Sequence, residues 1–250
     1  MELIDAHTHL DLGHFQSDID TVIARAKSAG VVGIVNCSTG PKSIHNTRLL
    51  MQAHPNYIFH SSGCSVSQLT REDALRIADL TRQYASEVVA VGEVGLDYHW
   101  IKDPAQRKAQ EPLFIQFMDL AMELHKPLVI HSRKAEAEAI ALVDQHYEGD
   151  VLMHCYDGTP EATAALKDRG WSVTLPANFD KYRNRIHAAQ ILPLESIMLE
   201  TDGPYLSPTT GRNEPSNVRH GCLSLARLLG LPVEDVAAAT TSNAKRFYSL

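Results

Sequence analysis

Short apolar runs alternate with longer amphipathic stretches from one end of the chain to the other. The apolar, often β-branched runs predict buried strands near residues 3–6, 31–37, 57–63, 88–93, 127–131, 150–154, 171–175 and 197–202. The stretches between them space their apolar residues as a helix does, and predict helices near 17–29, 42–53, 70–84, 105–124, 134–147, 160–168, 218–229 and 233–248, with a weaker one after 171–175.

Eight strands that alternate with helices over 250 residues predict an α/β fold, a (β/α)₈ TIM barrel. The continuously apolar strands fit a parallel sheet that is buried on both faces. A doubly wound open sheet has the same local pattern and is the structural alternative. No change in composition and no Pro/Gly-rich linker marks a boundary, so residues 1–250 are expected to form one domain.

Polar residues that can bind metal stand where the predicted strands end. His7 and His9 follow the first strand, and as alternate residues of an extended chain they lie on one face, about 7 Å apart along the backbone. The other strand ends carry Glu93, His131, His154 and Asp202. Alone, each would more often be a hydrogen-bonded loop or capping residue.

In a barrel these strand ends all open onto one face, where active sites are built. Four imidazoles and two carboxylates gathered there suit divalent Zn, Mn, Fe or Mg. Six ligands exceed the needs of one tetrahedral site, so two ions that share a bridging carboxylate are expected.

Composition and charge limit the binding partners and the cellular location that are expected for this chain. The net charge of −7 argues against a surface adapted broadly to duplex nucleic acid, but not against a narrow site in which metal ions supply positive charge. The four cysteines form no CxxC pair, and no signal peptide or run of about 20 apolar residues is present. A cytoplasmic protein with no membrane association and no obligate protein partner is expected.

Six motifs follow one another along the chain: Asp5-Ala6-His7-Thr8-His9, Gly92-Glu93-Val94-Gly95-Leu96-Asp97-Tyr98, Val129-Ile130-His131-Ser132-Arg133, His154-Cys155-Tyr156, Leu199-Glu200-Thr201-Asp202 and Arg212-Asn213-Glu214-Pro215. Together they closely resemble the motifs of the TatD family of metal-dependent deoxyribonucleases. The HxH motif alone indicates only the amidohydrolase-like superfamily, whereas GEVGLD and LETDGPYL narrow the match to TatD.

The resemblance implies a distorted TIM barrel with a binuclear metal site. One ion would be held by His7, His9, Glu93 and Asp202, and the second by Glu93, His131 and His154. It also implies a magnesium-dependent nuclease that trims DNA from single-stranded ends, often 3′ to 5′. Magnesium is therefore the expected ion in the cell, with zinc or manganese as alternatives.

Roles for individual residues follow from this arrangement. Asp202 is expected to orient the attacking water and take its proton, with Glu93 as the bridging ligand. Glu200 is expected to support a ligand rather than bind an ion. Arg133 and Asn213 are candidate substrate contacts; a salt bridge at the barrel rim and a loop-capping role are their respective alternatives.

The chain departs from the family pattern in two loops expected at the substrate mouth. Gly63-Cys64-Ser65-Val66 replaces the usual Gly-x-His-Pro, and Asp157-Gly158 replaces a Ser-Gly pair. A metal-dependent ester or amide hydrolase, such as a small-molecule amidohydrolase or a D-aminoacyl-tRNA deacylase, is therefore the main alternative; a non-catalytic metal-stabilised scaffold is another. No aromatic-basic platform for single strands is evident, although Tyr98, His99, Trp100 and Tyr205 fall in predicted rim loops.

Overall fold

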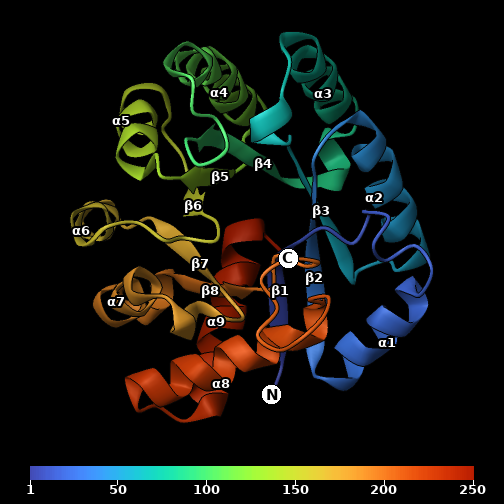
Figure 1. The fold of residues 1–250 in the computed structure, drawn as a ribbon. Coiled ribbons are helices and arrows are strands. Elements are labelled where there is room, and N and C mark those ends of the chain that lie inside the picture. The colour runs from blue at the N-terminus through green and yellow to red at the C-terminus, as the bar shows by residue number, and fades with distance from the viewer.

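Eight parallel strands form the centre of the molecule. The computed structural model describes residues 1–250 apart from the side chain of Gln68. The strands are β1 (Leu3–Thr8), β2 (Val31–Ser38), β3 (Ile58–Ser62), β4 (Val88–Asp97), β5 (Leu128–Arg133), β6 (Val151–Met153), β7 (Ser172–Pro176) and β8 (Ile197–Glu200). They neighbour one another in chain order, as Figure 1 shows. This order confirms the predicted (β/α)₈ TIM barrel, because a doubly wound sheet would reorder its strands.

Helices surround the strand ring, and all but the last of those described cover its outside (Figure 1). They are α1 (Ile19–Ser28), α2 (Pro41–Ala53), α3 (Arg71–Gln83), α4 (Pro104–Leu124), α5 (Glu136–His146), α6 (Pro160–Arg169), α7 (Arg183–Ile191), α8 (Val218–Leu229) and α9 (Val233–Tyr248). Local sequence sets several starts: Thr70, Asp103 and Thr159 each accept a hydrogen bond from the backbone N–H three residues on. None of these helices is long and apolar enough to cross a membrane.

The barrel interior has an apolar lower end, which helix α9 closes. Small and branched side chains from the strands meet α9 there: Ile4, Ala6, Val35, Cys37, Ala90, Val129, Leu152 and Met198, with Ala244, Phe247 and Tyr248. The Tyr248 hydroxyl donates to the carbonyl of Ala6 at 2.9 Å. In Figure 1 this helix, in red, lies behind β1 and β8. The last helix is therefore part of the core rather than a tail.

Strand β4 contains a bulge that aims a side chain. Val91 pairs with Leu128 and Val94 with Ile130, so three steps on β4 face two on β5. Ala90 packs in the lower end of the interior and Glu93, three residues later, also faces inward. Strict alternation would have turned one of them outward. The predicted strand ended at Glu93, whereas β4 continues to Asp97.

The seam between β8 and β1 is closed by the segment that follows β8. The backbone N–H of Asp202 donates to the carbonyl of His7 at 3.0 Å, and that of His9 to Gly203 at 2.9 Å. The buried Asp5 carboxylate accepts from both the N–H and the hydroxyl of Thr201, at 2.8 and 2.5 Å. These bonds place Asp202 beside the two histidines of β1.

Candidate metal centre

His7 and His9 are oriented from behind by one residue of β2. The carbonyl oxygen of Cys37 lies 2.8 Å from Nδ1 of His9, and its sulfur lies 3.1 Å from Nδ1 of His7. The opposite nitrogens face carboxylates: Nε2 of His9 is 3.5 Å from Asp202, and Nε2 of His7 is 3.4 Å from Glu93. Each ring therefore keeps one nitrogen for the protein and presents the other to the centre of the barrel.

Two further histidines, His131 in β5 and His154 directly after β6, repeat this arrangement. His154 places Nδ1 3.4 Å from Glu200 and Nε2 2.7 Å from Glu93. His131 places Nε2 3.1 Å from Asp97 and Nδ1 3.7 Å from Glu93. A carboxylate behind an imidazole fixes its orientation and raises its basicity, as outer partners of metal-binding histidines do.

One oxygen of Glu93 is the meeting point of the cluster. Its Oε2 atom lies within 3.7 Å of three imidazole nitrogens. The potential ligand atoms fall into three overlapping groups, each within 4.8 Å: His7, His154 and Asp202; His7, His9 and Glu93; Glu93, His131 and His154. The overlap means that the carboxylate of Glu93 can serve two ions at once.

The electrostatics of the cluster follow from burial and close opposite charges. Burial raises the pKa of Glu93, but the charge and hydrogen bonds of its histidine neighbours outweigh burial and hold that pKa well below its ordinary value. Burial lowers the pKa of His154, yet Glu93 and Glu200 together raise it well above its ordinary value. For His7, burial and the nearby His154 lower the pKa.

These residues fit divalent metal ions. The Nε2 atom of His7 is buried and has no hydrogen-bond partner in the described structure, although it points at the centre of the cluster. Buried polar atoms are normally satisfied, and a metal ion would satisfy this one. The nitrogen and carboxylate donors suit zinc, manganese and magnesium.

The six residues predicted as metal ligands therefore come together. The two predicted substrate contacts lie in different environments, Arg133 at the surface and Asn213 in the interior. Arg133 is exposed at the rim and forms no ion pair within 4 Å with a described side chain, so its predicted salt-bridge alternative is not observed. Asn213 is fully buried; its amide donates to the carbonyl of Thr201, and its oxygen accepts from Glu214 and Asn217. This geometry supports the loop-capping alternative for Asn213.

Glu200 and two residues not singled out from the sequence stand behind the cluster. Glu200 is fully buried and touches His154 rather than the centre, as expected of a supporting residue. Cys37 and Asp97 were missed as partners of His7, His9 and His131. The signal for Cys37 was its place near the end of the strand beside β1, and the signal for Asp97 was the GEVGLD motif.

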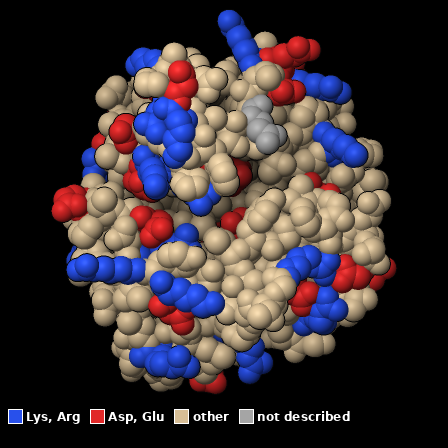
Figure 2. Space-filling model, in the orientation of Figure 1, with Lys and Arg blue, Asp and Glu red and all other residues tan. Residues whose placement is uncertain are grey.

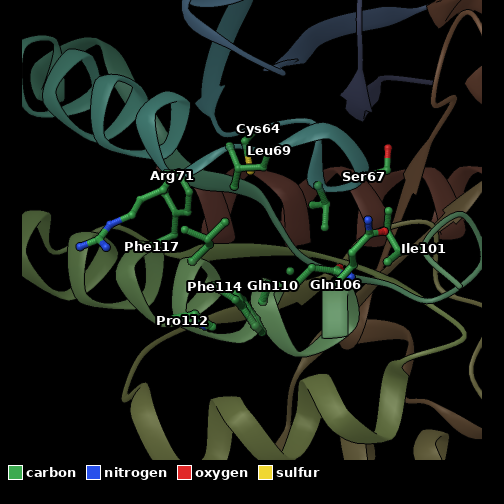
Figure 3. Close-up of a pocket in the computed structure, with 14 residues that line it drawn as sticks. Cys64, Ser67, Leu69, Arg71, Ile101, Gln106, Gln110, Pro112, Phe114 and Phe117 are labelled. Carbon is green, nitrogen blue, oxygen red and sulfur yellow. The ribbon is translucent and has the colours of Figure 1, made fainter. Parts of the chain in front are cut away.

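The segment at residues 63–66 lies beside an apolar cavity of about 550 Å³. Cys64, Val66 and Leu69 face Phe114 and Phe117 of α4 across it, as Figure 3 shows for the labelled residues. None of the six predicted metal ligands is among the described lining residues. The backbone N–H of Cys64 donates to the carbonyl of Glu93 at 2.9 Å, so the segment that follows β3 is bonded laterally to the bulged part of β4.

The fold and the cluster together place the protein among the TIM-barrel metal-dependent hydrolases. It belongs to the TatD family: the model for TatD related DNase matches residues 4–249. This match confirms the resemblance seen in the sequence motifs.

Relatives and solved structures agree with this placement. An uncharacterized metal-dependent hydrolase of Escherichia coli (strain K12), YcfH, is 32% identical over 261 residues, which cover 100% of this chain and 97% of that protein. The human deoxyribonuclease TATDN3 is 30% identical over 258 residues, covering 98% of this chain and 94% of that protein. The crystal structure of a TatD family hydrolase from Entamoeba histolytica has a TM-score of 0.89 at 19% identity and covers 99% of this chain and 98% of that one, a likeness of fold.

Proposed function

We propose that this hydrolase is a deoxyribonuclease that removes nucleotides from the 3′ ends of single-stranded DNA. The observation that carries the proposal is the position of Glu93, whose one oxygen meets three imidazoles, each held from behind by another residue. Two ions that share a carboxylate are a common arrangement for the hydrolysis of phosphodiesters. The name of the human relative, a deoxyribonuclease, supports DNA as the substrate.

The proposed ligands divide into two sets that share Glu93. His7, His9 and Asp202 complete the set for one ion, and His131 and His154 complete the other. When bound, two divalent ions supply Lewis acidity that offsets charge on the phosphate oxygens and lowers the pKa of water. Magnesium is the proposed ion in the cell, and zinc or manganese would bind the same donors.

Asp202 is the proposed general base. Burial raises the pKa of its carboxyl, but hydrogen bonding to His9 and the charge of His154 outweigh burial and lower it. Asp202 is therefore ionised at neutral pH, and a carboxylate can orient a water molecule and accept its proton. Its contact with His9 leaves it at the edge of the cluster, on the side of the β1–β8 seam.

The test is hydrolysis of a single-stranded oligonucleotide labelled at its 5′ end, by the purified protein with magnesium or manganese. The expected product is a ladder that shortens from the 3′ end, and Asp202→Asn is the inactive control. If DNA stays intact while a D-aminoacyl-tRNA or a lactone is cleaved, the ester or amide hydrolase replaces the nuclease. Release of the labelled 5′ nucleotide at once, without a ladder, would overturn the proposed polarity alone.

A further inference from the structure

Trp100 lies on the surface at the end of the barrel that carries the candidate metal centre. It follows the end of β4 and is 65% exposed, more than any other large apolar residue described in the structure. Tryptophan is usually largely buried, because its ring carries a large apolar area. The exposed ring at this end of the barrel therefore has apolar area available for contact with a bound ligand.

Positive charge surrounds this ring. The Arg133 guanidinium lies over it, 5.6 Å from its centroid, and the His99 ring meets it edge-on at 4.9 Å. Arg133, Lys102 and Lys134 are all close enough to lower the pKa of His99, with Arg133 the largest contributor. Figure 2 shows Lys and Arg side chains at the rim of the central hollow on this face, and acidic side chains within it.

A carboxylate connects this surface to the metal centre. One oxygen of Asp97 accepts from the backbone N–H groups of His99 and Trp100, at 2.8 and 2.7 Å. The other oxygen lies 3.1 Å from Nε2 of His131. The backbone that carries the ring is thus held one side chain away from a proposed metal ligand, and a nucleotide bound at the ring would lie close to the reacting bond.

We propose that Trp100 and Arg133 form a subsite for single-stranded nucleic acid, in which the indole stacks on an unpaired base and the guanidinium binds a backbone phosphate. Every base has a face that can stack on an aromatic ring, and Arg can supply the charge. The ring cannot stack in this way on bases that are already stacked in a duplex. This subsite rests on the proposed function for its role in cleavage, but not for binding.

The chain contains a matched control for this pair. Its other tryptophan, Trp171, also has a guanidinium, that of Arg169, 5.6 Å from its ring centroid. Trp171 is partly buried and immediately precedes β7, so it lies at the opposite end of the barrel from the metal centre. The two tryptophans share an arginine neighbour and differ in position.

Fluorescence of single-tryptophan proteins tests binding directly. In an Asp202→Asn background, Trp171→Phe leaves Trp100 as the only tryptophan, and Trp100→Phe leaves Trp171. Titration with a short oligothymidylate should quench the first protein saturably and leave the second unchanged. Equal quenching of both proteins, no quenching of the first, or equal quenching by a duplex of the same length would overturn the subsite.

Kinetics of the active enzyme separate the subsite from the nuclease function. Trp100→Ala should lower kcat/KM for the oligonucleotide, relative to that for a small phosphodiester, on the order of ten-fold, through KM. Trp171→Ala should leave this ratio unchanged, and Trp100→Phe should restore part of it. Arg133→Ala removes one phosphate contact. The slope of the logarithm of the oligonucleotide binding constant against the logarithm of the salt concentration should therefore become smaller in magnitude by about 0.7.

The two proposals fail in different ways. Quenching of the Trp100 protein without cleavage of DNA by the wild-type enzyme would keep the subsite and remove the deoxyribonuclease. Cleavage of DNA with an unchanged ratio in Trp100→Ala would keep the deoxyribonuclease and remove the subsite.

Discussion

The two ends of the barrel interior are built from the same eight strands and have opposite chemistry. At the lower end, side chains such as Ile4, Val35 and Met198 pack against Phe247 of α9. At the upper end the strands present imidazoles and carboxylates to one another. Burial of apolar surface stabilises the fold, whereas burial of charge costs free energy unless it is paired. The apolar lower end therefore contributes free energy of folding that offsets the cost of burying charged groups at the upper end.

Two buried histidines show how neighbouring charges decide protonation. Burial lowers the pKa of His60, in the middle of β3, to about 4, and its Nε2 atom lies 2.9 Å from the hydroxyl oxygen of Ser38. Burial acts on His154 in the same direction, but Glu93 and Glu200 reverse the outcome. The carboxylates, rather than depth in the protein, decide whether a buried imidazole is charged.

The largest effect is expected at the centre of the upper end. Replacing Glu93 by Ala removes the atom shared by both proposed ligand sets, so elemental analysis should find neither metal bound. Hydrolysis should fall roughly 10³-fold or more. Retention of two metal equivalents would show that the bridging assignment is wrong.

Asp202→Asn tests chemistry without removing the shared ligand. The amide cannot accept the proton of water, so kcat should fall roughly 10²–10⁴-fold. Circular dichroism should show an intact barrel, because the backbone N–H of residue 202, which bonds to His7, is unchanged. Near-normal turnover would remove Asp202 as the general base.

The lower end is tested by Phe247→Ala. This side chain is 9% exposed and packs in the lower end of the barrel interior, so its truncation should reduce the free energy of unfolding by about 3–5 kcal/mol. Denaturant unfolding gives this value. The folded variant should still bind metal, and loss of metal binding would show that the two ends are not independent.

His60, whose pKa is lowered, sets a pH dependence of stability of the opposite sign to that of His154, whose pKa is raised. Its pKa rises from about 4 in the folded protein to about 6.5 in the unfolded chain, so the unfolded chain binds more protons between these values. Its contribution to stability is complete above pH 6.5 and is lost as the pH falls toward 4. The nearby ion pair of Arg48 and Glu87 adds opposing charges.

The comparison with His60→Gln isolates this contribution. Between pH 7.5 and pH 4.5 the wild-type protein should lose about 2–3 kcal/mol more unfolding free energy than the variant. Urea unfolding at the two pH values measures the difference. Parallel losses in both proteins would mean that His60 is not buried in its neutral form.

The smallest loss of metal binding is expected at Asp97, which contacts the proposed metal ligand His131. Asp97→Asn weakens the partner of His131, and metal affinity should fall roughly 10–100-fold as measured by competition with a chelator. Asp103→Asn is the matched control, because this exposed residue caps α4 and asparagine caps equally well. An equal loss in both variants would point to the loop rather than to the imidazole.

Much of this architecture was predictable because barrel strands have a fixed polarity. Once the eight apolar runs were aligned, the polar residues at their ends had to share one face, and the structure brings all six together. The supporting residues were not predictable in this way. Cys37 and Asp97 reach their histidines through strand register and through a strand longer than the pattern indicated, which depend on the three-dimensional structure.

The sequence places Trp100 in a rim loop and makes Arg133 a candidate substrate contact, but it does not predict that the two lie together. Trp100 follows β4 and Arg133 ends β5, so they are far apart in the sequence, and only the pairing of Asp97 with Arg133 brings them together. The apolar pattern of α9 likewise predicted a helix but not its partner. A helix that packs on the outside and one that closes a barrel have the same periodicity.

Closure of the barrel by α9 has a consequence for synthesis of the protein. The lower end combines Ile4 with Phe247 and Tyr248, which lie more than 240 residues later in the sequence. A nascent chain on the ribosome can assemble neighbouring strand–helix units as they emerge, but its barrel stays open below until these aromatic residues have left the exit tunnel. The apolar lower end is therefore expected to form only after α9 has emerged from the ribosome, which makes its closure a late step in folding.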